Sequence, residues 1–542
     1  MNEHYDYIIV GAGSAGAALA DRLSADPAHS VLLLESGPVD KSLLVHMPRG
    51  LGMLMNPGSK YIWDYQVQTG GNLPPERWYR GRTLGGSSSV NGMIYMRGCP
   101  LDYDGWVAMG CKGWGWDEVG ATFKALEDHD LGPGKWRGAG GPLRITTHPK
   151  GDPLFEAILT AGEEMGIARV QDVNDLEAVR DGGLGYQPST RFGGRRFSSA
   201  RAFLQSARTR SNIDIVTDAT ALKIEFEGKR AVAVRVRDKE GTRNIRARRE
   251  IILSAGAIET PKLLQLSGIG PAGLLTSLGI AVVVDAPGVG QNLREHRHVD
   301  LCLRVKSHSQ NRDLGGMRAI WSVLRYIFGH KGPMTHAAHE IGGFAKSDDG
   351  LEHADLQFGL MSLSAGFDDV KGQVALDPFP GITFVTYFTR PESQGEVRIQ
   401  SADPDTLPII NANHLSVELD RRKFVAAFRW NRRLGQQPAL RDWVVKETGL
   451  AAGLNTDEEI LTNAMAVSGT CFHTAGTARM GVDDRAVVDP RLRVRGVHGL
   501  RIADTSIMPT LVSGNTNGPA MMIGRRAGDF VLQDQAASAT TG

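Results

Sequence analysis

The chain has 542 residues, more than one hydrophobic core usually supports, so we expect two domains or one elaborated domain. Its 61 basic and 60 acidic residues nearly cancel, and no basic stripe or acidic tail indicates nucleic-acid binding or a disordered region. The four cysteines lack metal-ligand spacing, no apolar run reaches the ~18 residues of a membrane span, and no signal peptide precedes the first strand. These features predict a cytoplasmic enzyme without a transmembrane segment, although the apolar residues 51–55 leave peripheral membrane contact open.

The chain begins with the pattern strand, glycine-rich turn, helix, strand. The apolar run 7–10 is followed at once by GAGSAG at residues 11–16, and a second apolar run, 30–34, ends at Glu35. A GxGxxG match inside a βαβ unit of about 30 residues predicts a dinucleotide-binding site. An acid at the position of Glu35 suits ribose hydroxyls rather than a 2′-phosphate, but it does not separate NAD from FAD.

Each glycine of this motif has a physical role. Gly11 permits the sharp turn after the strand, Gly13 lets the backbone approach a pyrophosphate, and Gly16 lets the helix pack closely on the sheet. The helix N-terminus adds unpaired N–H groups and the positive end of a dipole. The nucleotide-binding residues predicted at this end of the chain are Gly11, Gly13, Ser14, Ala15, Gly16 and Glu35.

The later segments differ in character. Residues 151–195 mix loops with one amphipathic helix, whereas 213–253 hold three apolar, strand-like runs. The region 300–460 contains alternating patterns typical of an antiparallel sheet, and a strand-like run at 500–503 precedes a loop and a terminal helix. His336 and His339 do not fit the HExxH order of a zinc site, and no GxSxG elbow occurs, so neither a metal site nor a serine hydrolase is predicted.

Five segments are similar, in the same order, to signature regions of the glucose-methanol-choline (GMC) oxidoreductases, a family of FAD enzymes. They are residues 80–98 (RGRTLGGSSSVNGMIYMRG), 256–271 (GAIETPKLLQLSGIGP), 288–296 (GVGQNLREH), 472–481 (FHTAGTARMG) and 499–519 (GLRIADTSIMPTLVSGNTNGP). The resemblance implies an α/β chain with a Rossmann-type FAD-binding domain and an α+β substrate-binding domain on an antiparallel sheet. It assigns residues 1–150, 196–300 and 465–542 to the FAD-binding domain, and 151–195 and 301–464 to the substrate-binding domain.

The resemblance also implies where FAD lies. Small residues at 85–87 would let the backbone pass beside the flavin and pyrophosphate, 91–94 would follow the isoalloxazine edge, and Ala221 would meet the adenine. Some members attach FAD through a histidine where this chain has Val90, and valine cannot form that bond, so noncovalent FAD is predicted. The residues assigned to this site are Thr83, Gly85, Gly86, Ser87, Val90, Asn91, Gly92, Met93, Ile94, Ala221, Ala255, Gly256, Ala503, Asp504, Asn515 and Thr516.

His473 lies in the family's HxxGT pattern. By this resemblance it is the base that takes the substrate's hydroxyl proton, a task that suits the pKa of imidazole. Its partner would be an asparagine ahead of the terminal helix, which hydrogen-bonds the alcohol oxygen. Asn515 is favoured for this role and Asn517 for the helix cap, but both stay candidates.

Three residues are assigned to the substrate pocket. Cys471 and Phe472 directly precede His473 and are expected to face the substrate. Glu340 resembles the residue that binds the substrate's cation in choline oxidases, but a structural hydrogen bond is favoured over that role. The leading hypothesis is oxidation of a primary aryl or aliphatic alcohol to the aldehyde, by hydride transfer to flavin N5 with His473 as base. Oxygen, a quinone or an electron-transfer protein would then reoxidise the flavin.

Other functions stay open at this point. Choline is the alternative substrate within the same reaction class. This fold also hosts hydroxynitrile lyases, in which flavin is bound but no redox reaction occurs. Related photodecarboxylases lack the histidine that this chain keeps, and a regulatory flavin-binding protein would not need the pair formed by His473 and Asn515.

Overall fold

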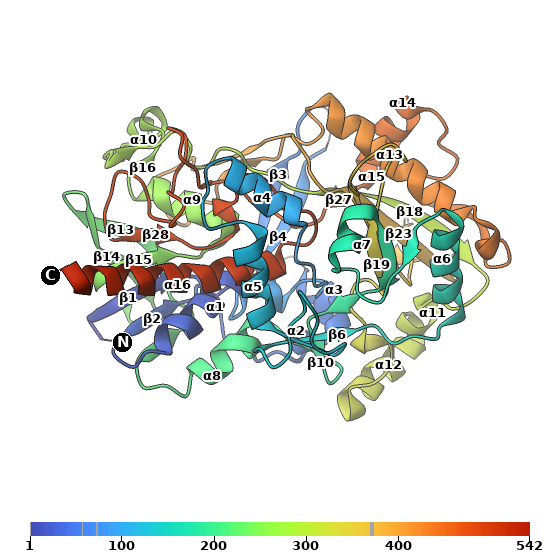
Figure 1. Cartoon of the computed structure of the whole chain (residues 1–542), viewed down its shortest axis with the longest axis horizontal. Helices are drawn as coiled ribbons and strands as arrows, with labels where there is room; N and C mark the ends of the chain where they lie inside the picture. The colour runs from blue at the N-terminus through green and yellow to red at the C-terminus, as the bar shows by residue number, and fades with distance from the viewer. Residues whose placement is uncertain (1, 57, 72–73, 369–372, 542) are drawn as a thin grey trace.

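The computed structural model describes residues 2–56, 58–71, 74–368 and 373–541 (Figure 1). A seven-stranded sheet has the order β12-β2-β1-β15-β14-β13, with β28 also paired to β15. Its strands are β1 (His4–Val10), β2 (Val31–Leu34), β12 (Ile213–Val216), β13 (Thr220–Glu227), β14 (Arg230–Asp238), β15 (Gly241–Leu253) and β28 (Leu500–Ile502).

Five of these strands, β12, β2, β1, β15 and β28, run parallel. Both faces of a parallel sheet are covered by other elements, so the sequences of its strands are continuous apolar runs. Accordingly, Ile8, Leu32 and Ile252 are all fully buried. The carboxyl ends of parallel strands meet at one edge, which is where such sheets bind ligands. The glycine-rich turn after β1 and the start of α1 (Ser14–Ser24) lie at this edge.

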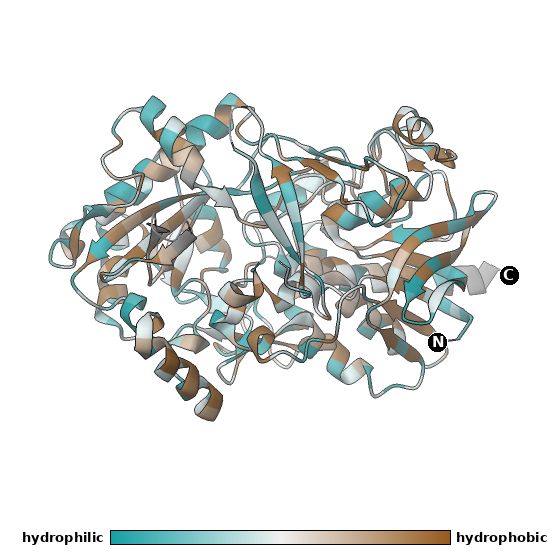
Figure 2. Ribbon diagram, turned by 180° about the vertical axis from the view of Figure 1, so that it is seen from behind, coloured by the Kyte–Doolittle hydropathy of each residue, from teal (hydrophilic) through white to brown (hydrophobic). Residues whose placement is uncertain are grey.

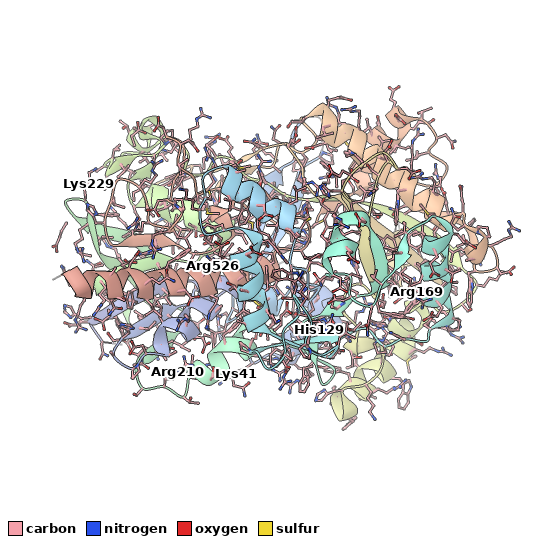
Figure 3. The ribbon with its side chains drawn as sticks, in the orientation of Figure 1. Lys41, His129, Arg169, Arg210, Lys229 and Arg526 are labelled. Carbon is pink, nitrogen blue, oxygen red and sulfur yellow. The ribbon has the colours of Figure 1, made fainter. Side chains whose placement is uncertain are left out.

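The last helix packs on the first. α16 (Asn517–Thr541) lies along α1, so closely that a Cβ on Gly524 would be 2.0 Å from the carbonyl oxygen of Ala15. Arg526 of α16, labelled in Figure 3, also reaches α5 (Trp116–Leu126). Its guanidinium donates to the Thr122 hydroxyl at 3.4 Å. These contacts fix the N-terminus of α16, and the loop before it, at the ligand-binding edge.

A second sheet, of eight strands, has the order β26-β18-β23-β20-β19-β8-β7, with β27 paired to β18. All its pairs are antiparallel except β7 with β8. α13 (Glu418–Gly435) and α6 (Pro153–Glu164) cover one face, where Phe358 packs against Trp430. The strands are β7 (Ala168–Arg169), β8 (Gly183–Tyr186), β18 (Arg297–Val305), β19 (Ile341–Ala345), β20 (Leu356–Met361), β23 (Gly381–Phe388), β26 (Val444–Thr448) and β27 (Gly469–Thr470).

The two sheets confirm the predicted α/β class, with a Rossmann-type parallel sheet and a separate antiparallel one. The division into five domain segments stays a prediction. A smaller sheet crosses its proposed boundaries, because β25 (Ile409–Asn411) pairs with β3 (Ile62–Gln68). No helix within the described ranges is both long and apolar enough to span a membrane.

The close crossing of α16 and α1 predicts opposite effects for two glycine-to-alanine changes. Gly524→Ala should lower the stability of the FAD-bound protein by about 1–3 kcal/mol, because the new methyl group overlaps a carbonyl oxygen. Gly273→Ala in α10 (Ala272–Ser277) meets no atom within 4 Å and should raise stability by up to about 1 kcal/mol. Thermal unfolding of both variants measures this, and equal midpoints would contradict the predicted close approach.

Candidate active site

Two adjoining cavities lie at the ligand-binding edge. The first has a volume of about 150 Å³ and follows the ends of β1, β2 and β15. The second has a volume of about 200 Å³ and reaches the loop before α16. Five residues line both cavities, so together they form one elongated site: Ser14, Arg80, Ser87, Thr505 and Ala520.

Glycines expose bare backbone to the first cavity. Gly11 has φ +103°, and a Cβ there would lie 2.5 Å from the carbonyl oxygen of Ser254. Gly86 has φ +51°, and its Cβ would lie 2.7 Å from the Cα of Gly13. Of the residues predicted to bind FAD, this cavity is lined by Gly11, Gly13, Ser14, Ala15, Glu35, Gly86, Ser87, Ala221, Ala255, Gly256 and Asp504.

Glu35 is buried at the end of β2 and lines the first cavity. Its carboxylate accepts the N–H of Ala12 at 3.1 Å and that of Gly37 at 2.9 Å. Burial raises the pKa of this carboxyl to about 7, against the opposing effect of those two hydrogen bonds. Because each oxygen holds a second lone pair, Glu35 can also accept hydrogen bonds from ribose hydroxyls.

Four residues predicted to bind FAD do not line either cavity, and each of them contacts other parts of the protein instead. A Cβ on Gly16 would lie 1.9 Å from the Gly11 carbonyl oxygen, so this glycine serves the close packing of α1. The Thr83 hydroxyl donates to the Pro38 carbonyl. The N–H groups of Gly85 and Ala503 donate to the carbonyls of Ala12 and Leu253, respectively. All four support the cavity wall from behind.

The second cavity brings the remaining predicted residues together. Its walls combine the 87–94 segment, the residues around His473 and the loop before α16. Cys471 and Phe472 both line it, and their role in a substrate pocket stays a prediction. The other predicted residues that line it are Ser14, Ser87, Val90, Asn91, Gly92, Met93, Ile94, His473, Asn515, Thr516 and Asn517.

The hydrogen bonds of His473 determine which of its ring nitrogens carries the proton. His296 Nε2 lies 2.8 Å from the Thr389 carbonyl oxygen, which can only accept, so Nε2 of neutral His296 bears the hydrogen. His296 Nδ1 is therefore an acceptor, and it lies 2.9 Å from Nδ1 of His473. His473 must then donate through Nδ1, which leaves a lone pair on Nε2.

Burial, reinforced by the neighbouring His296, holds the pKa of His473 well below the usual histidine value. Burial likewise lowers the pKa of His296, to about 4. Both rings are therefore neutral at pH 7, as the hydrogen-bond chain requires. His473 offers an unprotonated Nε2 to the cavity.

Asn515 meets that nitrogen, with Nδ2 of the amide 2.9 Å from His473 Nε2. The amide is held at its other end, because Oδ1 accepts a hydrogen bond from Gln357 Nε2 at 2.9 Å. Gln357 in turn accepts the Tyr387 hydroxyl at 2.6 Å. The orientation of Asn515 therefore depends on β20 and β23 of the antiparallel sheet.

Asn517 has different contacts from Asn515. It is the first residue of α16, and its Oδ1 accepts the Ser14 hydroxyl at 2.8 Å. Its Nδ2 is buried and has no hydrogen-bond partner among the described residues. An unpaired buried donor at a helix N-terminus fits the electron-rich carbonyl edge of a flavin, so the residues present suit FAD here.

The backbone around His473 is fixed from two sides. The Glu295 carboxyl accepts the His473 N–H at 2.7 Å, and burial raises the pKa of that carboxyl to about 8. Arg80 donates to the Phe472 carbonyl at 2.6 Å, and Phe472 adopts a left-handed φ of +61°. These contacts hold the strained residue before the base in place.

Sequence reasoning assigned no role to His296, Gln357, Thr389 or Arg80. His296 ends the 288–296 motif, so a signal for it was present. Arg80 likewise begins the 80–98 motif and lines both cavities. Gln357 and Thr389 lie in no recognisable sequence motif. Their contacts with Asn515 and His296 become visible only in the folded structure.

Glu340 lies apart from the cavity that holds His473, at a position where the sequence left open a substrate contact and favoured a structural hydrogen bond. Its carboxylate is fully buried, pairs with Arg49 at 2.8 Å and accepts the Ser362 hydroxyl at 2.7 Å. Burial alone would raise the pKa of Glu340, but the His336 hydrogen bond and the Arg49 charge lower it to about 2. This position agrees with the structural alternative, because Glu340 lines neither cavity.

Comparisons with known proteins identify the family of the chain. A family model described as GMC oxidoreductase matches residues 5–298 with its N-terminal part and 391–524 with its C-terminal part. The chain is 38% identical to an alcohol dehydrogenase [acceptor] of Pseudomonas putida over 536 residues, 98% of this chain and 96% of the relative. It is also 38% identical to an oxygen-dependent choline dehydrogenase of Brucella anthropi, covering 97% and 95%. The crystal structure of pyridoxine 4-oxidase from Mesorbium loti superposes with a TM-score of 0.87 at 30% identity, covering 97% of this chain and 98% of that one.

The hydrogen-bond chain predicts that His296→Leu slows flavin reduction by substrate roughly 10–100-fold with FAD still bound. The change removes the acceptor for His473 Nδ1, so the ring loses its fixed tautomer. Stopped-flow absorbance measures the rate, with His353→Leu, in a loop outside both cavities, as control. A normal rate in His296→Leu would show that the tautomer is set by other means.

Proposed function

This chain belongs to the GMC oxidoreductase family, and we propose that it oxidises a primary aryl or aliphatic alcohol to the aldehyde with noncovalently bound FAD. It is an FAD-dependent enzyme that acts on alcohol or choline-like CH–OH donors. The observation that carries the finer proposal is the contact of neutral His473 with Asn515 at the wall of the second cavity. Val90 lines this wall and offers no atom for a covalent bond to the flavin.

Two side chains would act on the substrate hydroxyl. When bound, FAD supplies the hydride acceptor. Nε2 of His473 holds a lone pair and would take the hydroxyl proton. The Asn515 amide, which donates to His473 at 2.9 Å, would instead donate to the alcohol oxygen and stabilise its developing negative charge.

The cavity wall favours an uncharged, largely apolar alcohol. Apolar side chains of Leu51, Ile94 and Phe472 line it, and Tyr79 stacks on Phe472 with ring centroids 6.3 Å apart. Among its described lining residues none is acidic, and Arg80 is the only one with a fixed charge. These lining residues include no carboxylate that could pair with the ammonium group of choline, so we rank choline below neutral alcohols.

The acceptor is proposed to be a carrier other than oxygen, as in a dehydrogenase. The relatives named above include both an acceptor-dependent and an oxygen-dependent dehydrogenase, so the acceptor needs a direct measurement. After anaerobic reduction by substrate, admission of air should restore the flavin absorbance slowly. Recovery within the time of one turnover would instead identify an oxidase.

Anaerobic mixing with a panel of alcohols tests the reaction. A primary alcohol should bleach the flavin absorbance, and His473→Ala should slow this step by roughly 10²–10⁴-fold while FAD stays bound. His353→Ala, in a loop outside both cavities, is the control. If no alcohol bleaches the flavin, a lyase-type, non-redox reaction becomes the better interpretation; if His473→Ala keeps the normal rate, His473 is not the base.

The low pKa of His473 predicts the pH dependence of flavin reduction. The reaction needs the neutral imidazole, and burial keeps the ring neutral to a lower pH than free histidine. The rate should therefore stay constant as the pH falls from neutral to about 6.5, the usual histidine value, and decline only below it. A decline already above that pH in stopped-flow traces would contradict this protonation state.

A further inference from the structure

A single helix outside the active site carries an unusual apolar surface. α12 (Gly316–Gly329) projects from the body of the protein and is strongly apolar in colour at the lower edge of Figure 2. Three of its side chains are largely exposed: Met317 at 74%, Trp321 at 65% and Phe328 at 84%. Buried apolar area is the main source of folding stability, so such exposure needs another explanation.

Helix geometry places these side chains on one face. At 100° per residue, Met317, Trp321 and Phe328 fall within a narrow arc, together with Ile320 and Leu324. We call this the α12 apolar face, made of Met317, Ile320, Trp321, Leu324 and Phe328.

The opposite side of the helix attaches it to the protein. Tyr326 and Val323 pack in a small cluster with Met47 and Met334. The Tyr326 hydroxyl donates to the His46 carbonyl at 3.0 Å. The α12 apolar face therefore points away from the protein, which leaves it free for an external surface.

The charged residues of α12 and of the two residues that follow it are of one sign. Residues 314–331 contain Arg318, Arg325 and Lys331 and no aspartate or glutamate. Arg318 and Arg325 are one helical repeat of seven residues apart, so they lie together along one border of the α12 apolar face. An apolar strip with Trp and Phe, bordered by cations, matches the interfacial region of an anionic bilayer.

The size and shape of the face argue against a protein partner. A 14-residue helix is about 21 Å long and about 10 Å wide, so its face covers about 200 Å². A stable protein–protein interface buries about 800 Å² on each partner. The face of a single convex helix is too small to form such an interface by itself. The same helix can insert its side chains between lipid headgroups, which requires no matching groove.

We propose that α12 docks this enzyme on an anionic phospholipid surface, with the α12 apolar face among the acyl-chain ends and Arg318 and Arg325 on lipid phosphates. The contact is peripheral. The segment that holds α12, at His46 and Met47, is close to the active site in the chain. It directly precedes the segment with Leu51 and Met55, two residues that line the second cavity. Docking would therefore bring the cavity near the membrane, where apolar alcohols concentrate.

Co-sedimentation of the holoenzyme with vesicles tests the proposal. Wild type should bind vesicles of phosphatidylcholine mixed with phosphatidylglycerol, and bind phosphatidylcholine alone much more weakly. Phe328→Glu should weaken binding to the mixed vesicles roughly tenfold or more, because it removes the most exposed apolar side chain. Leu450→Glu, at a residue 72% exposed on another element, is the matched control and should bind like wild type.

A second pair of measurements separates the electrostatic contribution to vesicle binding from the apolar contribution. Arg318→Glu combined with Arg325→Glu should weaken binding to the mixed vesicles roughly fivefold or more for each charge removed. Raising the salt to about 1 M, where the screening length is about 3 Å, should have a similar effect. FAD content and activity on a water-soluble substrate should stay normal in all variants, which shows that the fold and the reaction are unaffected.

Failure of wild type to bind mixed vesicles would overturn the proposal. Equal weakening by Phe328→Glu and Leu450→Glu would also overturn it, since the effect would then be nonspecific. A wild-type dimer that Phe328→Glu converts to a monomer, without vesicle binding, would identify a second copy of the chain as the occupant. None of these outcomes depends on the alcohol reaction, so the two proposals fail separately.

Discussion

A carbonyl oxygen, which can only accept hydrogen bonds, fixes the chemistry of the candidate active site. The Thr389 carbonyl determines the tautomer of His296, and His296 determines that of His473. The lone pair that would take a proton from substrate is thus set by a backbone atom two residues away in the hydrogen-bond chain. Burial keeps both rings neutral, so the arrangement does not depend on a charged group.

The two sheets position different parts of this site. The parallel sheet supplies the cradle for the cofactor through the turn at Gly11 and the carboxylate of Glu35. The antiparallel sheet holds the reacting side chains in orientation, through Gln357 and Thr389. The C-terminal segment joins both, because it carries Asn515 and then runs along α1 as α16.

Sequence reasoning reached furthest where the chemistry is local. The spacing of the motif at Gly11 predicts a nucleotide site, His473 was named through the resemblance of its segment to a known family, and the α/β class follows from the same motifs. It failed where a contact joins distant residues: Gln357 reaches Asn515 across 158 positions, and Glu340 meets Arg49 across 291. A charged residue gives no sign in the sequence of which distant partner will neutralise it, so the Arg49 partner of Glu340 was not predicted.

The α12 helix also shows how differently two parts of one chain can change over evolution. The residues that orient His473 belong to a network in which one altered member misplaces the rest, so this part tolerates little variation. α12 attaches through a few side chains around Tyr326, and Met317, Trp321 and Phe328 on its outer face stay largely exposed. Relatives could therefore gain, lose or recharge this helix in a few mutational steps, and the same catalytic machinery could move between cellular surfaces.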